Sequence, residues 1–152
     1  AQDISDLGEI NEILQIIVNS AEKLDRYILN VHDYYSVRRG EFNIVDVDLD
    51  IIAADMQVMY EAIAHAKGIK FTITVNELGV FRSDEVSVKL ILNNLLSNAF
   101  KYQKKDYNYK YVHLEMGVEK GVPTFIVKDS GIGIPDKYVG DIFNLFFRAL
   151  SL

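Results

Sequence analysis

The chain has 152 residues, of which 49% are hydrophobic and 25% are charged, a balance typical of one compact globular domain, alone or with an appended element. Its formal net charge of −6 argues against bulk attraction to nucleic acid or to anionic lipid. There is no cysteine, which excludes disulfides, and no apolar run approaches the ~18 residues that a membrane span needs.

The first predicted element is a long amphipathic helix at residues 6–39. Its apolar residues alternate spacings of four and three, at Ile10, Leu14, Ile17, Ala21, Leu24, Ile28, Val31 and Tyr35. Such a seven-residue repeat is typical of a helix packed along another helix. Asp6 and Glu9 resemble a capping box, and Gly40 fits a C-terminal cap. We predict an intermolecular helical bundle, and the alternative is a helix lying on its own domain.

The rest of the chain alternates strands and helices. We predict strands at 42–49, 69–75, 79–82, 111–118 and 124–128, and helices at 50–67, 84–103 and 136–147. The helix at 50–67 should carry Ile51, Ile52, Met56, Met59, Tyr60 and Ile63 on one face. Ser83 and Asp84 offer an N-cap for the next helix. This order predicts an α+β fold, a mixed sheet with helices on one face.

The helix at 84–103 carries a polar face. Asn94, Asn98 and Lys101 are spaced four then three, so they share the side opposite the apolar residues. An amide oxygen can ligate a hard cation without cancelling its charge, and a lysine one turn further on can reach phosphate oxygens. The pattern fits phosphate bound through a divalent cation. A solvated polar face is the alternative.

A glycine segment, KDSGIGIP at 128–135, follows a strand. Asp129 stands at the strand's C-terminal end, where ligands of α/β structures often bind. A buried carboxylate there can accept a hydrogen bond from an exocyclic amine, which suits adenine. Gly131 and Gly133 permit close backbone approach and unusual dihedral angles. An ordinary turn is the alternative, but together with the polar helix face the segment indicates a nucleotide pocket.

Three motifs occur in an order that resembles a known family. NLLSNAFKY at 94–102 resembles the N box, DSGIGI at 129–134 the first glycine box, and IFNLFFRA at 142–149 the F box of the ATP-binding domain of sensor histidine kinases. That domain is part of the wider GHKL ATPase superfamily. The run LNVHDYYSVRRGEF at 29–42 resembles the end of the second helix of the dimerisation and histidine phosphotransfer domain. The resemblance spans residues 6–149.

The resemblance implies a Bergerat-type sandwich that binds Mg-ATP. It makes Asn98 a ligand of Mg²⁺, assisted by Asn94, and gives Lys101 a contact with phosphate. Tyr102 would line the nucleotide and Asp129 would read adenine. The implied nucleotide-binding set is completed by Gly131, Gly133, Phe143, Phe146, Phe147 and Arg148.

The implied organisation has two parts. Residues 1–40 would be the second helix of the dimerisation and phosphotransfer bundle, and residues 41–152 the ATP-binding domain. In the parent protein, ATP would phosphorylate a histidine, and the phosphoryl group would pass to the receiver domain of a response regulator. The expected assembly is a homodimer through 6–39, cytoplasmic, without nucleic acid or direct membrane contact. Whether the parent is membrane-anchored stays open.

Two departures from the family pattern bear on activity. His32, His65 and His113 are the only histidines, and none stands in an H box, so we expect no phosphoacceptor in this chain. His32 precedes Asp33 but lies near the end of the presumed second helix. The chain stops at Leu152, before a second glycine box that would form the lid. We therefore expect it to bind ATP weakly or not at all and to have no kinase activity alone.

One position separates branches of the superfamily. Its ATPase members place a glutamate general base where this chain has Asn94, and an asparagine cannot take a proton from water. The sequence therefore favours holding ATP for transfer over hydrolysing it. A second hypothesis is a non-catalytic dimerisation and response-regulator docking module with a degenerate ATP fold. The tyrosines at 107, 109 and 111, interleaved with lysines, are interpreted as a solvated loop.

Overall fold

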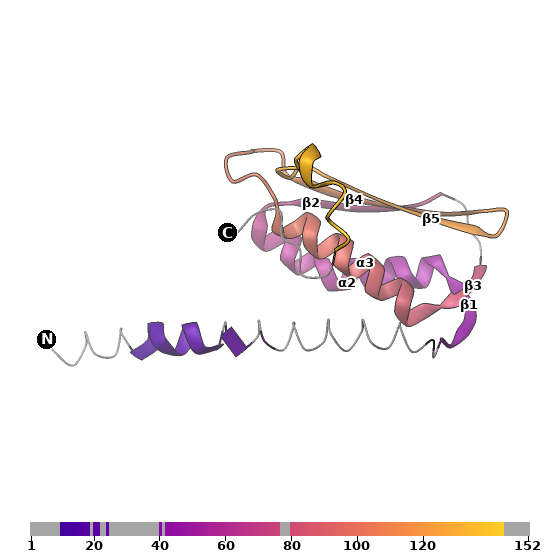
Figure 1. Ribbon diagram of the computed structural model, residues 1–152, viewed down its shortest axis with the longest axis horizontal. Helices are drawn as coiled ribbons and strands as arrows, with labels where there is room; N and C mark the ends of the chain where they lie inside the picture. Colours follow the sequence, from indigo (N-terminus) through magenta and orange to yellow (C-terminus); the bar gives the residue numbers. More distant parts are fainter. Residues whose placement is uncertain are drawn as a thin grey trace, which may run out of the picture. The chain divides into compact units, whose positions relative to one another are not determined.

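The computed structural model describes residues 10–18, 20, 21, 24, 40, 42–76 and 80–144 (Figure 1). The chain divides into two compact units, Ala1–Phe42 and Asn43–Leu152. Within the described residues, no helix has both the length and the apolar character that crossing a membrane requires.

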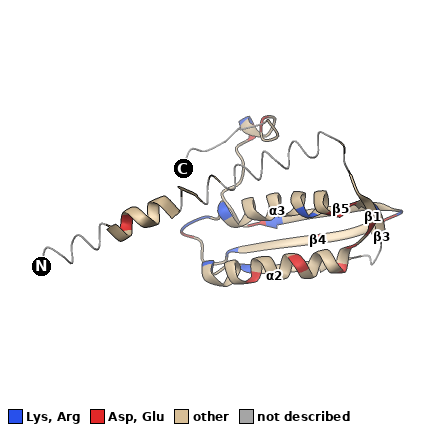
Figure 2. Ribbon diagram, turned by 90° about the horizontal axis from the view of Figure 1, so that it is seen from below, with Lys and Arg blue, Asp and Glu red and all other residues tan. Residues whose placement is uncertain are grey.

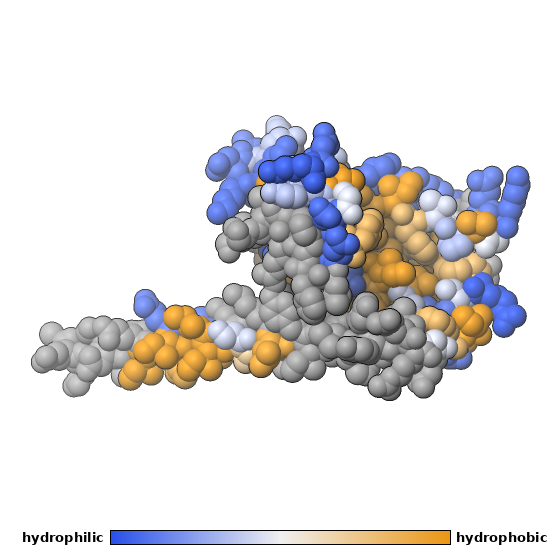
Figure 3. Space-filling model, viewed as in Figure 1, coloured by the Kyte–Doolittle hydropathy of each residue, from blue (hydrophilic) through white to orange (hydrophobic). Residues whose placement is uncertain are grey.

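The first unit is helical at residues 10–18, 20, 21 and 24, as the seven-residue repeat predicts. Ile10, Leu14, Ile17 and Leu24 expose between 52 and 60% of their surface, and Figure 3 shows hydrophobic side chains gathered along this stretch. Gly40 has the left-handed φ of +70° that suits a C-terminal cap. The capping pair Asp6 and Glu9, together with His32, lies outside the described residues.

The second unit places two helices on one face of a three-stranded sheet (Figures 1 and 2). Its elements are β1 (Ile44–Asp48), α2 (Leu49–Lys67), β2 (Lys70–Val75), β3 (Val80–Asp84), α3 (Glu85–Lys101), β4 (Tyr111–Glu119), β5 (Val122–Asp129) and the 3₁₀ helix η1 (Asp136–Tyr138). The sheet order is β2-β4-β5, with β2 parallel and β5 antiparallel to β4. β1 and β3 form a separate antiparallel pair. The predicted α+β fold is confirmed.

Aspartates begin both helices. The Asp48 carboxylate accepts a hydrogen bond from the Asp50 backbone N–H at 2.8 Å, and Asp84 accepts one from the Ser87 N–H at 2.8 Å. Asp84 also accepts from the Asn43 N–H at 3.0 Å, which ties the start of α3 to the start of β1. Gly68 ends α2 with a φ of +61°, a left-handed conformation that glycine adopts without a Cβ penalty.

The core lies between the two helices and the sheet. The largest fully buried side chains are Leu49, Ile52, Met56, Leu92, Leu96, Leu114, Met116, Val47 and Val112. At one end, the Tyr60 and Phe100 rings stack with centroids 5.0 Å apart, and Phe71 meets Phe100 edge-on at 5.3 Å. The Tyr60 hydroxyl donates to the Asn93 side chain, so this buried polar group is satisfied.

The structure corrects part of the predicted α2 face. Ile52, Met56 and Tyr60 are buried, but Ile51, Met59 and Ile63 are 57, 50 and 39% exposed. The physical reason is geometric: the buried residues Ile52, Met56, Tyr60 and Ala64 follow each other every four positions and make one narrow stripe against the sheet. Apolar character alone did not identify that stripe.

The predicted helix at 136–147 is wrong over its described part. Only Asp136–Tyr138 is helical, as a single 3₁₀ turn, and residues 139–144 form turns and a bend. The Asp141 N–H donates to the Tyr138 carbonyl and the Asn144 N–H to the Asp141 carbonyl, both at 2.9 Å. These bonds span three residues rather than four, and Gly140 lowers the local helix propensity.

Replacing Leu96 by alanine tests the core assignment. Leu96 is fully buried on α3, so Leu96→Ala is expected to lower the free energy of unfolding by about 2–5 kcal/mol. The matched control is Leu95→Ala, because the neighbouring Leu95 is 42% exposed and leaves a smaller cavity. Urea unfolding followed by circular dichroism measures both variants, and equal losses would contradict the assignment.

Asp84 predicts a pH dependence of stability. Hydrogen bonds from Ser87, and then from the Asn43 backbone, hold the pKa of the Asp84 carboxyl below its usual range. The charged cap therefore contributes stability above the unfolded-state pKa of about 3.9, and this contribution is lost as the pH falls through the lower folded-state pKa. Asp84→Asn keeps a capping oxygen but removes the charge. In urea unfolding, the stability difference between wild type and variant should shrink below about pH 4, and a difference that does not change with pH would contradict this prediction.

Candidate functional site

The glycine segment joins the C-terminal end of α3. The Ile132 backbone N–H donates to the Tyr102 carbonyl at 2.9 Å, and Gln103 and Gly131 form an isolated antiparallel bridge. The two motifs that sequence analysis singled out, at 94–102 and 129–134, therefore meet in space. They hold α3 and the end of β5 in one fixed arrangement.

Ser130 and Gln103 strengthen this junction. The Ser130 hydroxyl donates to Gln103 Oε1 at 2.8 Å and accepts from the Tyr111 N–H at 2.9 Å. Gln103 Nε2 donates to the Ala99 carbonyl at 2.7 Å, back along α3. These contacts link the end of α3, the start of β4 and the end of β5. Sequence analysis assigned no role to Ser130 or Gln103, because nothing in their local pattern distinguishes them from loop residues.

Position 131 requires glycine, because the backbone of Tyr102 leaves no room for a Cβ there. A Cβ at this position would lie 2.5 Å from Asp129 Oδ1 and 2.6 Å from the Tyr102 carbonyl oxygen, closer than real Cβ contacts occur. Gly133 has a φ of +72°, the left-handed region that favours glycine. The backbone does come close at Gly131, but the group it meets is the protein's own end of α3, and approach to a ligand stays a prediction.

Three asparagines on α3 differ in their surroundings. Asn93 faces α2, where it accepts from the Tyr60 hydroxyl. Asn94 and Asn98 are exposed, and their side-chain amides make no hydrogen bond to any other described residue. Beyond the regular helix bonds, their backbone carbonyls accept from the Ser97 hydroxyl at 3.1 Å and the Tyr102 N–H at 3.0 Å. Both amide groups are therefore available to a ligand or a cation.

Lys101 and Tyr102 lie together at the end of α3. Lys101 Nζ is 3.2 Å from the Tyr102 hydroxyl oxygen and 4.8 Å from the centre of its ring. A cation over an aromatic face is stabilised by the ring's electron distribution, and the helix C-terminus also favours positive charge. This arrangement positions one positive charge beside the junction.

Asp129 departs from the prediction, because it is exposed rather than buried. Its Oδ1 accepts from the Gly131 N–H at 2.7 Å, and its Oδ2 makes no hydrogen bond to another described residue. Exposed and half-buried residues alternate along β5, which lies at the edge of the sheet, and its last two residues, Lys128 and Asp129, are both exposed. One oxygen is held by the turn and the other can bind a ligand.

The predicted F-box residues are only partly described. Phe143 is 92% exposed, so it packs against nothing substantial in the described part of the chain. Phe146, Phe147 and Arg148 lie outside the described residues. The structure thus brings together the N-box and glycine-box candidates, and it does not bring Phe143 to them.

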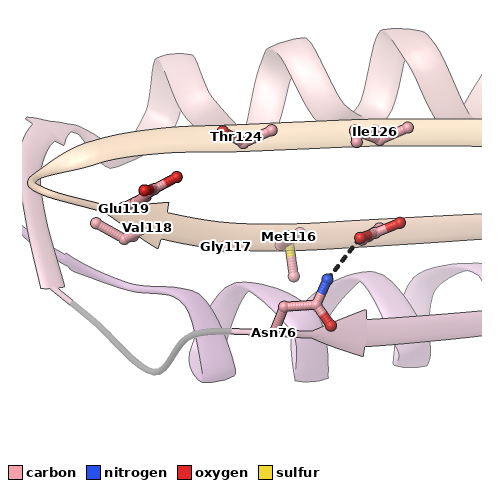
Figure 4. A pocket seen from close by; sticks show the side chains of 8 residues that line it. Asn76, Met116, Gly117, Val118, Glu119, Thr124 and Ile126 are labelled. Atoms are coloured by element: carbon pink, nitrogen blue, oxygen red, sulfur yellow. Dashed lines mark hydrogen bonds between the residues drawn. The ribbon is translucent and has the colours of Figure 1, made fainter.

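A hollow of about 210 Å³ occurs elsewhere, near the β4–β5 hairpin (Figure 4). It is lined by Asn76, Glu115, Met116, Gly117, Val118, Glu119, Thr124 and Ile126. Asn76 donates to Glu115 Oε1, while Lys128 Nζ lies 3.1 Å from Oε2 and holds the pKa of the Glu115 carboxyl below its usual range. None of the nominated nucleotide residues lines this hollow. In the described part of the chain, no three His, Cys, Asp or Glu residues are grouped to hold a metal.

Comparison with known families gives an independent result. Residues 83–151 match the family model described as "Histidine kinase-, DNA gyrase B-, and HSP90-like ATPase". A relative in Dictyostelium discoideum, "Hybrid signal transduction histidine kinase C", is 32% identical over 141 residues, which cover 90% of this chain and 12% of the relative. The chain spans between 11 and 18% of the length of this and two further curated relatives.

Solved structures of similar fold are histidine kinases as well. Histidine kinase ThkA in complex with the response regulator protein TrrA matches with a TM-score of 0.67 at 20% identity, over 90% of this chain and 40% of that one. Full-length ShkA in complex with AMPPNP matches with a TM-score of 0.57 at 26% identity, over 64% of this chain and 21% of that one.

Replacing Gly131 by alanine tests the junction. The added Cβ cannot fit without moving the Tyr102 carbonyl or the Asp129 carboxylate, so Gly131→Ala is expected to lower the free energy of unfolding by about 1–3 kcal/mol. Gly140→Ala is the matched control, because nothing lies within 4 Å of its Cβ position. Thermal or urea unfolding measures both, and a neutral Gly131→Ala would show that the two motifs are not in tight contact.

Proposed function

Residues 83–151 belong to the histidine kinase-, DNA gyrase B- and HSP90-like ATPase family, and from this premise we propose that the chain is the Mg-ATP-binding part of a sensor histidine kinase. In the complete protein, the γ-phosphoryl group of ATP passes to a histidine and then to a response regulator. The observation that best supports the proposal is the junction between α3 and the glycine segment, because it puts the exposed amides and Asp129 on one rigid unit.

The residues of the junction suit a nucleotide held through Mg²⁺. Asn98, assisted by Asn94, offers amide oxygens to the cation, and these are hard, uncharged ligands with no competing side-chain partner in the described chain. Lys101 contributes positive charge for phosphate, and Tyr102 offers a ring beside it. The free oxygen of Asp129 accepts a hydrogen bond from the exocyclic amine of adenine, with Gly131 and Gly133 shaping the turn. Bound Mg²⁺ neutralises phosphate charge during phosphoryl transfer.

The proposed reaction is transfer rather than hydrolysis. Asn94 has no basic group with which to take a proton from water, so the chain does not activate a hydrolytic nucleophile at that position. A histidine supplied by the complete protein attacks the γ-phosphorus instead; the bond from this phosphorus to the β–γ bridging oxygen breaks, and ADP leaves. Phosphoryl transfer depends mostly on positioning and electrostatic stabilisation, which a bound nucleotide and a docked acceptor provide.

The first unit is proposed to mediate assembly. Its exposed apolar repeat at residues 10–24 fits the second helix of a dimerisation bundle, with the domain boundary near residue 40. These apolar side chains are more than half exposed in the single chain. Burying them against a second copy of the helix removes apolar surface from water, and this favours a homodimer. The similarity to ThkA, which was solved with a response regulator, supports docking of a receiver domain to the parent protein.

The 152-residue polypeptide alone is proposed to bind nucleotide weakly and to lack kinase activity. Asn94, Asn98 and Asp129 are all exposed, and water around them weakens their attraction for a cation or for phosphate. His65, an exposed residue of α2, and His113, which contacts Thr72 Oγ1 through its Nδ1 at 2.7 Å, are not proposed as acceptors.

An Mg-ATP titration tests this function. With millimolar Mg-ATP, backbone NMR shifts should gather at the end of α3 and at 129–133, and Asn98→Ala should weaken binding by about tenfold, the effect of losing roughly 1.4 kcal/mol. Asn76→Ala, in the separate hollow, is the control and should bind as wild type does. No shift at all would favour the non-catalytic docking module, and micromolar affinity by calorimetry would refute weak binding.

A further inference from the structure

One end of the second unit carries a cluster of lysines, here called the lysine end: Lys67, Lys70, Lys104, Lys105 and Lys110. Lys67 is the last residue of α2, Lys70 the first of β2, and the other three lie in the loop between α3 and β4. Figure 2 shows Lys and Arg at the end where the two helices finish. Elements far apart in sequence thus supply one surface.

Direct contacts hold these elements together. The Lys70 backbone N–H donates to the Lys110 carbonyl at 2.9 Å, and Lys67 Nζ donates to the Phe100 carbonyl at 3.3 Å, near the end of α3. The two helices run parallel, since Asp55 pairs with Lys89 at 2.7 Å and Tyr60 binds Asn93 further along both. Both helix C-termini therefore point to the lysine end.

The positive charge of the lysine end is not neutralised locally. Among the described residues, none of its five ammonium groups pairs with a carboxylate. The ion pairs in the described part of the chain involve other residues: Arg82–Asp46, Lys89–Asp55, Lys89–Glu85 and Lys128–Glu115. Asp106 lies in the loop itself, and Asp129, at the end of β5, pairs in register with Val112 near the start of β4. The aspartates that begin the helices, Asp48 and Asp84, lie at the opposite end.

Exposed aromatic rings stand beside these cations. Tyr109 is 80% and Tyr107 43% exposed, and their rings meet edge-to-face with centroids 6.5 Å apart. Lys104 Nζ lies 5.7 Å from the centre of the Tyr107 ring. Solvation of the loop does not require two exposed rings in contact with each other. Exposed tyrosines are, in contrast, enriched where proteins bind one another.

We propose that the lysine end, together with Tyr107 and Tyr109, is a docking surface for an acidic polypeptide segment. The ammonium groups meet its carboxylates, and the tyrosine rings pack on its apolar or aromatic side chains. This function is separate from nucleotide binding and excludes Lys101. The sequence alone favoured a solvated loop. The fold instead favours a binding surface, because it brings Lys67 and Lys70 next to the loop lysines.

A polypeptide fits this surface better than nucleic acid does. Asp106 sits within the loop and Asp129 beside it, and the chain as a whole carries a net charge of −6. The phosphate backbone of a nucleic acid would extend past the lysine end and be repelled by the net negative charge of the rest of the chain. A short acidic polypeptide segment can stay within the lysine end. Complementary charge of this kind speeds association and makes binding sensitive to salt.

The test uses a fluorescent random copolymer of glutamate and tyrosine as the probe. In low salt, the triple variant Lys104→Gln/Lys105→Gln/Lys110→Gln should bind the copolymer at least about tenfold more weakly than wild type, with a weaker salt dependence. The matched control is Arg82→Gln/Lys120→Gln/Lys137→Gln, which removes the same charge elsewhere and should bind nearly as wild type does. Urea unfolding verifies that both triple variants stay folded.

A second variant separates rings from charge. Tyr109→Ser keeps every lysine and should weaken binding of the glutamate–tyrosine copolymer more than binding of polyglutamate. Equal losses in the two triple variants would show that only bulk charge matters and would overturn the proposal. Tighter binding of duplex DNA than of the copolymer at the same salt concentration would also overturn it, as would failure of the wild-type chain to bind the copolymer.

Discussion

The hydrogen bond between the Ile132 N–H and the Tyr102 carbonyl is the contact on which the proposed site depends. It forms because Gly131 has no side chain to keep the two backbones apart. Asn94 and Asn98 stand on α3 and Asp129 on β5, elements separated by a loop and a whole strand. Core packing already holds α3 on the sheet, and the junction adds a direct backbone contact between the helix end that carries the amides and the turn that follows the carboxylate.

The same helix geometry accounts for both the stability and the charge distribution of the second unit. Aspartates cap the N-termini of α2 and α3, and lysines stand at their C-termini, as the helix dipole favours. Because the two helices run parallel, these local preferences add up, and negative charge gathers at one end of the unit and positive charge at the other. A pattern that stabilises each helix separately thus also creates a surface with a preference for acidic partners.

Much of the fold could be predicted from sequence, and the errors have physical causes. Strand alternation and capping residues located β1 to β5, α2 and α3 within a few positions, because these signals are local. Ile51, Met59 and Ile63 were placed on one apolar face with the residues that are buried, but only the sheet's position decides which stripe of α2 is covered. The helix at 136–147 and the burial of Asp129 were likewise inferred from neighbours in sequence rather than from neighbours in space.

The sequence by itself determined most of the strands and helices of the second unit, their capping residues and the resemblance to the histidine kinase family, since each depends on residue types within a short span. Tertiary structure alone decided that Asn93 serves Tyr60 while Asn94 and Asn98 stay available, and that Ser130 and Gln103 hold the junction. It alone brought Lys67 and Lys70 beside the loop lysines. Contacts between residues distant in the chain depend on how the helices pack on the sheet, which no local pattern encodes.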